Sequence, residues 1–157
     1  MRIPTLLLAA LAASAASASN YREVAKAVND DALLATAGVT PAEARVRKQC
    51  RAAVIDGDDA PDFFDCVYVQ TERELNLFSL EDGFLMNELE LTLHNIDGVA
   101  LQHVDRWSQV QIFSGRRVAA LYIHGNGWID TSQTEGVYQW LLEHGVPARA
   151  PRTWIGP

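Results

Sequence analysis

The sequence predicts an α+β fold: two N-terminal helices, an antiparallel meander forming a sheet or partly open barrel of six to seven strands, and a C-terminal helix. Three observations support this order. Helix caps and helical apolar spacing extend to about residue 54, apolar residues recur with period two over 66–124, and one more capped helix follows. The 157 residues, 48% of them hydrophobic, are enough for one domain with a substantial core.

Residues 1–18 are expected to be a secretory signal peptide. Arg2 precedes the apolar run LLLAALAA, and two Ala-Ser-Ala triplets supply the small residues typical of a cleavage site. The apolar run is shorter than the roughly 20 residues that a membrane-spanning helix needs. We therefore expect cleavage near Ala18 and a bacterial protein that is periplasmic or secreted and does not span a membrane after cleavage.

Residues 19–55 are expected to form an N-terminal helical segment. A capping pattern from Asn20 to Glu23, followed by apolar residues at helical spacing, predicts a helix over about 20–36. A second helix is predicted to begin at Thr40, with Pro41 in its first turn. Its apolar stripe consists of Val46, Cys50, Ala53 and Val54.

Residues 56–147 are expected to form a β domain that ends in a helix, with 148–157 as a short Pro-rich tail. After an acidic loop over 56–65, alternating residues and turn signals predict strands at 66–71, 75–80, 88–93, 99–104, 107–113 and 118–124. The Gly-rich turn over 125–127 then breaks the sheet. Ser132 and Glu135 form a capping box for the last helix, which Gly145 ends.

The two cysteines, Cys50 and Cys66, enclose a 15-residue segment. Export to an oxidising compartment favours a disulfide between them, and a pair of free core thiols is the alternative. A zinc site is not expected, because the spacing is not that of a Cys-rich metal site. No cofactor is predicted.

The chain is acidic, with 20 Asp and Glu against 13 Lys and Arg and a formal net charge of −7. Nucleic-acid binding is not expected, because it requires Lys and Arg to displace the counterions of phosphate. The acidity is concentrated over 56–97, which holds twelve acidic residues and one basic residue, Arg73.

Three stretches carry a resemblance: VYVQTERELNLFSLEDGFLMNELELTLHNIDGVAL, WSQVQIFSGRRVAALYIHG and the helical VYQWLLEHG. Together they resemble the bacterial pleckstrin-homology-like domains over residues 62–145. The resemblance implies a meander closed by a helix, and a binding or scaffolding role. Phosphoinositide binding is not carried over, because the acidic block over 56–97 would repel phosphate.

No catalytic motif stands out, so the favoured hypothesis is a non-enzymatic binding module of the cell envelope whose partner is a protein or envelope component. The candidate binding residues are exposed cations and aromatic residues of the second half of the chain: Arg106, Trp107, Arg116, Arg117 and Trp128. If the cations face one side, they would suit a carboxylate-bearing partner. Their alternative role is that of ordinary charged hairpin tips.

Two other functions stay open at this level. One is a small periplasmic hydrolase or lyase that uses His124, Asp130 and Asp97. The other is a calcium-binding accessory protein that uses the five aspartates of the 56–65 loop, although these lack the spacing of an EF-hand.

Overall fold

The computed structural model of the protein describes residues 21–153 and 155–156, so the predicted signal peptide lies outside the described residues. The α+β class is confirmed: an open antiparallel sheet of eight strands follows short N-terminal helices and precedes a C-terminal helix. The helices are residues 21–27, α2 (Asp31–Thr36) and α3 (Thr131–Glu143). The strands are β1 (Val46–Asp56), β2 (Phe63–Gln70), β3 (Glu74–Glu81), β4 (Phe84–Thr92), β5 (Gly98–Val104), β6 (Trp107–Ser114), β7 (Arg117–Gly125) and β8 (Trp128–Ile129).

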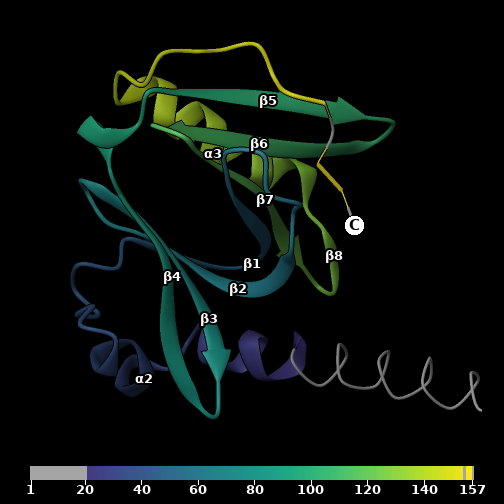
Figure 1. The fold of residues 1–157 in the computed structure, drawn as a ribbon. Helices are drawn as coiled ribbons and strands as arrows, with labels where there is room; N and C mark the ends of the chain where they lie inside the picture. The colour runs from purple at the N-terminus through teal and green to yellow at the C-terminus, as the bar shows by residue number, and fades with distance from the viewer. Residues whose placement is uncertain (1–20, 154, 157) are drawn as a thin grey trace, which may run out of the picture.

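The sheet has the strand order β4-β3-β2-β1-β7-β6-β5, and β8 extends it by pairing with the end of β7. β1 joins the two meanders because it pairs with β2 through residues 46–53 and with β7 through residues 49–56. In Figure 1 the sheet bends, so that β5 and β6 run across the top while β3 and β4 run steeply down the lower part. The helix α3 packs on β5, β6 and β7.

Both faces of the sheet are covered in part. Alternate residues of β2 point to opposite sides: Cys66 and Tyr68 enter the main core, whereas Val67 and Val69 pack under the N-terminal helices. This explains why the last five residues of β2 are all buried, as expected for a strand with both faces covered. The main core also receives Val137 and Leu141 of α3, so the inner face lies between the bent sheet and this helix.

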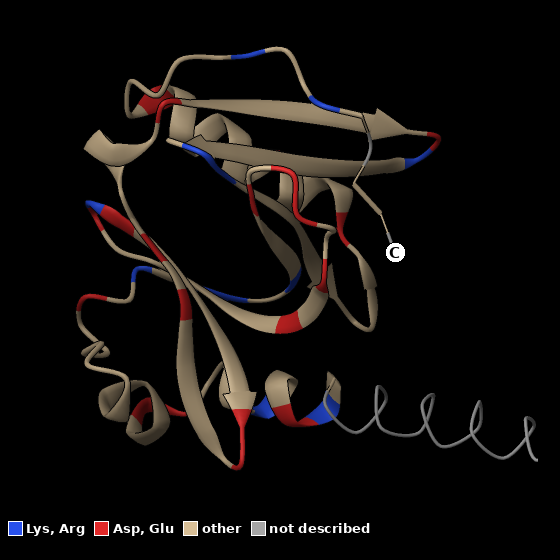
Figure 2. Ribbon diagram, in the orientation of Figure 1, with Lys and Arg blue, Asp and Glu red and all other residues tan. Residues whose placement is uncertain are grey.

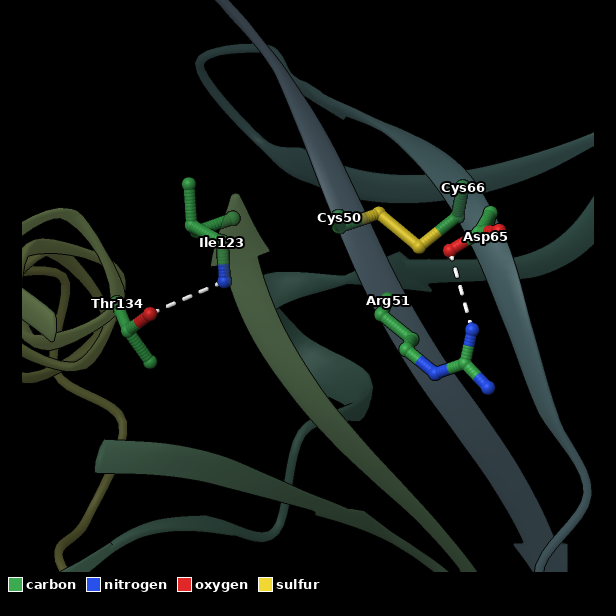
Figure 3. The surroundings of a disulfide bond; sticks show 6 residues. All are labelled: Cys50, Arg51, Asp65, Cys66, Ile123 and Thr134. Carbon is green, nitrogen blue, oxygen red and sulfur yellow. Dashed lines mark hydrogen bonds and ion pairs between the residues drawn. A yellow bond between two sulfur atoms is a disulfide. The ribbon is translucent and has the colours of Figure 1, made fainter. Parts of the chain in front are cut away.

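The disulfide between Cys50 and Cys66 is present and fully buried. The two cysteines are direct partners in the β1–β2 register, with their Cα atoms 4.8 Å apart. Figure 3 shows that Arg51 and Asp65, the next pair in the register, form an ion pair at 3.3 Å beside the bond. The bridge therefore ties the central strand to the first meander.

The predicted second helix is wrong, because residues 46–55 form most of β1 and belong to the sheet. Half of the predicted capping pattern does form: the Glu43 carboxylate accepts from the Thr40 backbone amide at 3.3 Å and from the Thr40 hydroxyl at 2.5 Å. However, the chain makes only one turn there before it becomes extended. A cap contributes little unless a helix propagates from it, and here hydrogen bonds to β2 and β7 on both sides of the strand favour the extended backbone.

Two further helix predictions need correction. The helix predicted over 20–36 is interrupted at residues 28–30, where Asp30 caps α2 by accepting from the Leu33 amide at 3.0 Å. The last helix begins at Thr131, capped by Asp130 and not by Ser132. The Glu135 carboxylate instead accepts a hydrogen bond from Ser108 at 3.0 Å, which ties α3 to β6. Its predicted end is confirmed, since Gly145 adopts a positive φ of 85°.

Candidate binding surface

The structure brings three of the five predicted binding residues together. Arg106, Trp107 and Trp128 line one open hollow, which Gly125, Ile129, Asp130 and Thr131 complete. The hollow lies where the β5–β6 turn, the end of β7 and the start of α3 meet. An exposed tryptophan, Trp128, together with a half-buried one, Trp107, and a cation is the composition that protein interfaces favour.

A tight turn places Trp128 in this hollow. Asn126 and Gly127 both have positive φ, 51° and 88°, which is the conformation of the two-residue hairpin turn that matches strand twist. As a result the chain does not leave the sheet after Gly125, as the sequence suggested, but returns along β7 as β8. This pairing places Trp128 opposite Gly125, next to the β5–β6 turn.

The arginine of the hollow is held in position. The Arg106 guanidinium carbon lies 4.7 Å from the centroid of the Trp107 ring, a cation–π arrangement, and the Arg106 carbonyl accepts from the Thr131 hydroxyl at 2.9 Å. By contrast, the Trp128 side chain lies open to solvent, with 71% of the residue exposed. A large aromatic side chain with that exposure beside an ordered cation is suited to contact a partner.

The other two predicted residues, Arg116 and Arg117, are far from this hollow. They lie at the opposite end of the β6–β7 hairpin, and the seven residue steps of β6 from Trp107 to Ser114 span about 23 Å. The Arg116 guanidinium pairs with Asp56 at 3.6 Å, and Arg117 faces Asp56 in the β1–β7 register. The condition that all these cations face one side is therefore not met.

The residues of the hydrolase alternative do not converge. Asp97 accepts a hydrogen bond from the Gly115 amide at the Arg116 end of β7, whereas His124 and Asp130 lie at its other end. The Asp130 carboxylate is used as a helix cap, accepting from the Gln133 backbone at 2.9 Å and from its side chain at 2.8 Å. These three residues therefore do not form a general acid–base set.

Two of the five aspartates of the calcium alternative, Asp56 at the end of β1 and Asp65 in β2, pair with arginines. Asp56 pairs with Arg116, and Asp65 pairs with Arg51. Within residues 21–153 and 155–156, no three His, Cys, Asp or Glu side chains are placed to hold a metal ion. Figure 2 shows acidic residues along this loop and the β3–β4 turn, and basic residues on the C-terminal tail.

His124 lies in a half-buried position beside the ring of Tyr21, with ring centroids 5.9 Å apart. Its Nδ1 atom is buried and has no hydrogen-bond partner among the described residues. Burial lowers the pKa of His124, the charge of Arg51 acts in the same direction, and Asp65 opposes them. The imidazole is therefore held neutral.

This environment predicts a pH-dependent contribution to stability. Between the lowered pKa of folded His124 and the ordinary value of about 6.5, the unfolded chain binds a proton that the folded chain does not, so the free energy of unfolding falls as pH drops through this range. We expect His124→Asn to lose less stability than the wild type between pH 7.5 and pH 5, measured by urea unfolding. If both proteins lost the same free energy of unfolding over this pH range, the lowered pKa of His124 would be contradicted.

One group of residues was missed by the sequence analysis. Gln109, Gln111 and Tyr122 are buried and contact the C-terminal tail, to which the sequence pattern assigned no partner. A signal was present, because the two glutamines alternate with the apolar Val110 and Ile112 inside a predicted strand. Such polar residues at i and i+2 share one face of a strand.

The chain matches no protein-family model, and no curated protein is similar to it in sequence. It is similar to a solved structure of Vav1 inhibited by an allosteric inhibitor, with a TM-score of 0.44 and 10% sequence identity. The match covers 64% of this chain and 25% of that chain, so this chain spans about a quarter of its length. Among the described residues, no helix is both long and apolar enough to cross a membrane.

Proposed function

We propose that this protein is an exported, non-enzymatic binding module of the bacterial cell envelope, with a pleckstrin-homology-like fold. The observation that carries the proposal is the exposed Trp128 beside the Arg106–Trp107 pair. The two meanders, the closing helix and the buried disulfide are consistent with such a module in an oxidising compartment. The activity itself is argued from this surface, because fold alone does not transmit function.

The chemistry of the surface indicates what the partner presents. Arg106 offers a guanidinium that its stacking on Trp107 holds in a defined orientation, and this suits a carboxylate. Trp128 offers an aromatic face to an apolar side chain. A protein that presents an acidic residue next to an apolar one therefore fits better than a phosphoinositide or a nucleic acid, whose phosphates the acidic block over 56–97 would repel.

The test compares two exposed aromatic residues. Trp128→Ala should weaken binding of the envelope partner about 30-fold, as expected for the loss of an interface residue worth about 2 kcal/mol. Phe84→Ala is the matched control, because Phe84 is 63% exposed on the β3–β4 hairpin, away from the hollow. The measurement is cross-linking in periplasmic extract to identify the partner, followed by titration of the purified pair.

Retention of full affinity in Trp128→Ala, or an equal loss in Phe84→Ala, would contradict the assignment of this surface. Failure of the wild-type protein to enrich any partner at any salt concentration would count against the binding role itself.

A further inference from the structure

The C-terminal tail lies across the outer face of β5, β6 and β7, on the side of the sheet opposite α3. Val110 and Ile112 of β6 point into the main core, so Gln109, Gln111 and Phe113 point outward beneath the tail. Both glutamines are 0% exposed. A side-chain amide buried on a sheet face needs hydrogen-bond partners, and here the tail backbone supplies them.

Each glutamine binds both the amide and the carbonyl of one tail residue, and Gln111 also donates to the Thr153 carbonyl at 3.5 Å. The Gln111 oxygen accepts from the Arg152 amide at 2.8 Å, and its nitrogen donates to the Arg152 carbonyl at 3.3 Å. The Gln109 oxygen accepts from the Ile155 amide at 3.3 Å, and its nitrogen donates to the Ile155 carbonyl. A third contact joins the Tyr122 hydroxyl to the same carbonyl at 2.9 Å. These bonds recognise an extended main chain, independently of its side chains.

The two amides also form one unit. The Gln111 nitrogen donates to the Gln109 oxygen at 3.0 Å, and the Gln109 nitrogen donates to the Tyr122 hydroxyl at 2.9 Å. The side chains of Gln109, Gln111 and Tyr122 are thus held in place by hydrogen bonds to one another as well as by the tail. This is the arrangement of a preformed binding site, in which polar groups are fixed before a ligand arrives.

Three side-chain contacts add selectivity to the backbone contacts. Ile155 packs against the small apolar cluster of Ala100, Phe113 and Val118. The guanidinium carbons of Arg149 and Arg152 lie 4.7 Å and 5.9 Å from the centroid of the Phe113 ring. The segment held in this site therefore carries basic residues, the second of them three positions before an aliphatic one.

The acidic loop after β1 forms the other wall of this site. Asp58 and Asp59 line an open hollow together with Pro151, Arg152 and Ile155 of the tail. A wall of negative charge favours a basic segment, and this gives the 56–65 loop a role other than metal binding. Residues 149–153 themselves are exposed, so the tail buries few of its side chains and is held mainly through its backbone.

We propose that the outer face of β5, β6 and β7 is a binding site for extended peptides, with the C-terminal tail as its resident occupant. A partner segment with a basic residue three positions before an aliphatic one displaces the tail, because it offers the same backbone groups to Gln109 and Gln111 and the same side chains to Phe113 and its neighbours. Residues 149–153 are exposed and are held mainly through their backbone, so exchange requires local opening and not unfolding. The site is distinct from the hollow around Trp128.

The test uses the full chain and a fluorescent peptide of residues 147–157 as the probe. In the wild type the attached tail competes at an effective concentration in the millimolar range, so the peptide should bind weakly. Ile155→Asp in the chain weakens the attached tail, since it removes the apolar anchor and adds a charge near Asp58 and Asp59. We expect this variant to bind the wild-type peptide at least tenfold more tightly, measured by fluorescence anisotropy.

Two controls address recognition and folding. Adding Gln111→Leu to the Ile155→Asp chain should abolish peptide binding, and the thermal melt of that double variant reports whether it is folded. A peptide that itself carries Ile155→Asp should not bind the Ile155→Asp chain, and this comparison needs no further change in the protein. Equal affinity of the wild-type and Ile155→Asp chains for the wild-type peptide, or equal binding of the two peptides, would overturn the proposal.

Discussion

Replacing Cys50 and Cys66 together by alanine should lower the free energy of unfolding by about 3 kcal/mol. The bridge closes a 15-residue loop, and the loss follows from the entropy that the unfolded chain regains when that loop opens. Both positions are fully buried at the join between β1 and β2, so alanine fits without introducing a polar group. Urea unfolding of the double variant and of the wild type measures the difference.

The wild type treated with reductant is the internal control for this change. Reduction should destabilise the wild type by a similar amount and leave the double variant unaffected. If the double variant unfolded at the same urea concentration as the wild type, the bridge would have no part in holding the central strand to the first meander.

A loss of similar size is expected at the contact between α3 and the sheet. Leu141→Ala should cost about 3 kcal/mol of unfolding free energy, because Leu141 is fully buried in the main core and its removal leaves a cavity between the helix and β5–β7. Glu143→Ala, two residues later on the exposed side of the helix, is the matched control and should change stability by less than about 0.5 kcal/mol. Both are measured by urea or thermal unfolding.

Near-equal stability of Leu141→Ala and Glu143→Ala would mean that α3 does not seal the core. This matters for the site as well, because Asp130 and Thr131, at the start of α3, form part of the hollow around Trp128. A helix held loosely would not position the β5–β6 turn through the bond between Thr131 and Arg106.

Much of the meander could be predicted because its signals are local. Alternation in ELELTL places Leu89 and Leu91 in the core, and Asp82-Gly83 forms the predicted turn with both residues at positive φ. The central strand could not be predicted in this way. Its apolar residues fit a helical as well as a strand period, and its partner β7 lies more than 60 residues further along the chain. Only the long-range pairing decides between the two.

The candidate binding surfaces also combine features that local sequence predicts with features that depend on distant contacts. Sequence composition identified Trp128, Arg106 and Trp107 as binding candidates, but the register of β8 on β7 decides that they share a hollow and that Arg116 and Arg117 do not. The peptide site is harder still to predict from the sequence. Gln109 and Gln111 bind the backbone of a tail that lies more than 40 residues later in the chain.

Local sequence patterns were enough to predict the α+β class, the positions of most strands and turns, the uneven distribution of charge and the pair of cysteines. These features depend on residue periodicity, turn chemistry and composition, which act over a few neighbouring positions. Tertiary structure alone decided that residues 46–55 are a strand, which exposed residues lie together, and what the tail covers. Each of these depends on contacts between distant segments, whose hydrogen bonds and packing override local helix signals and supply partners for buried amides.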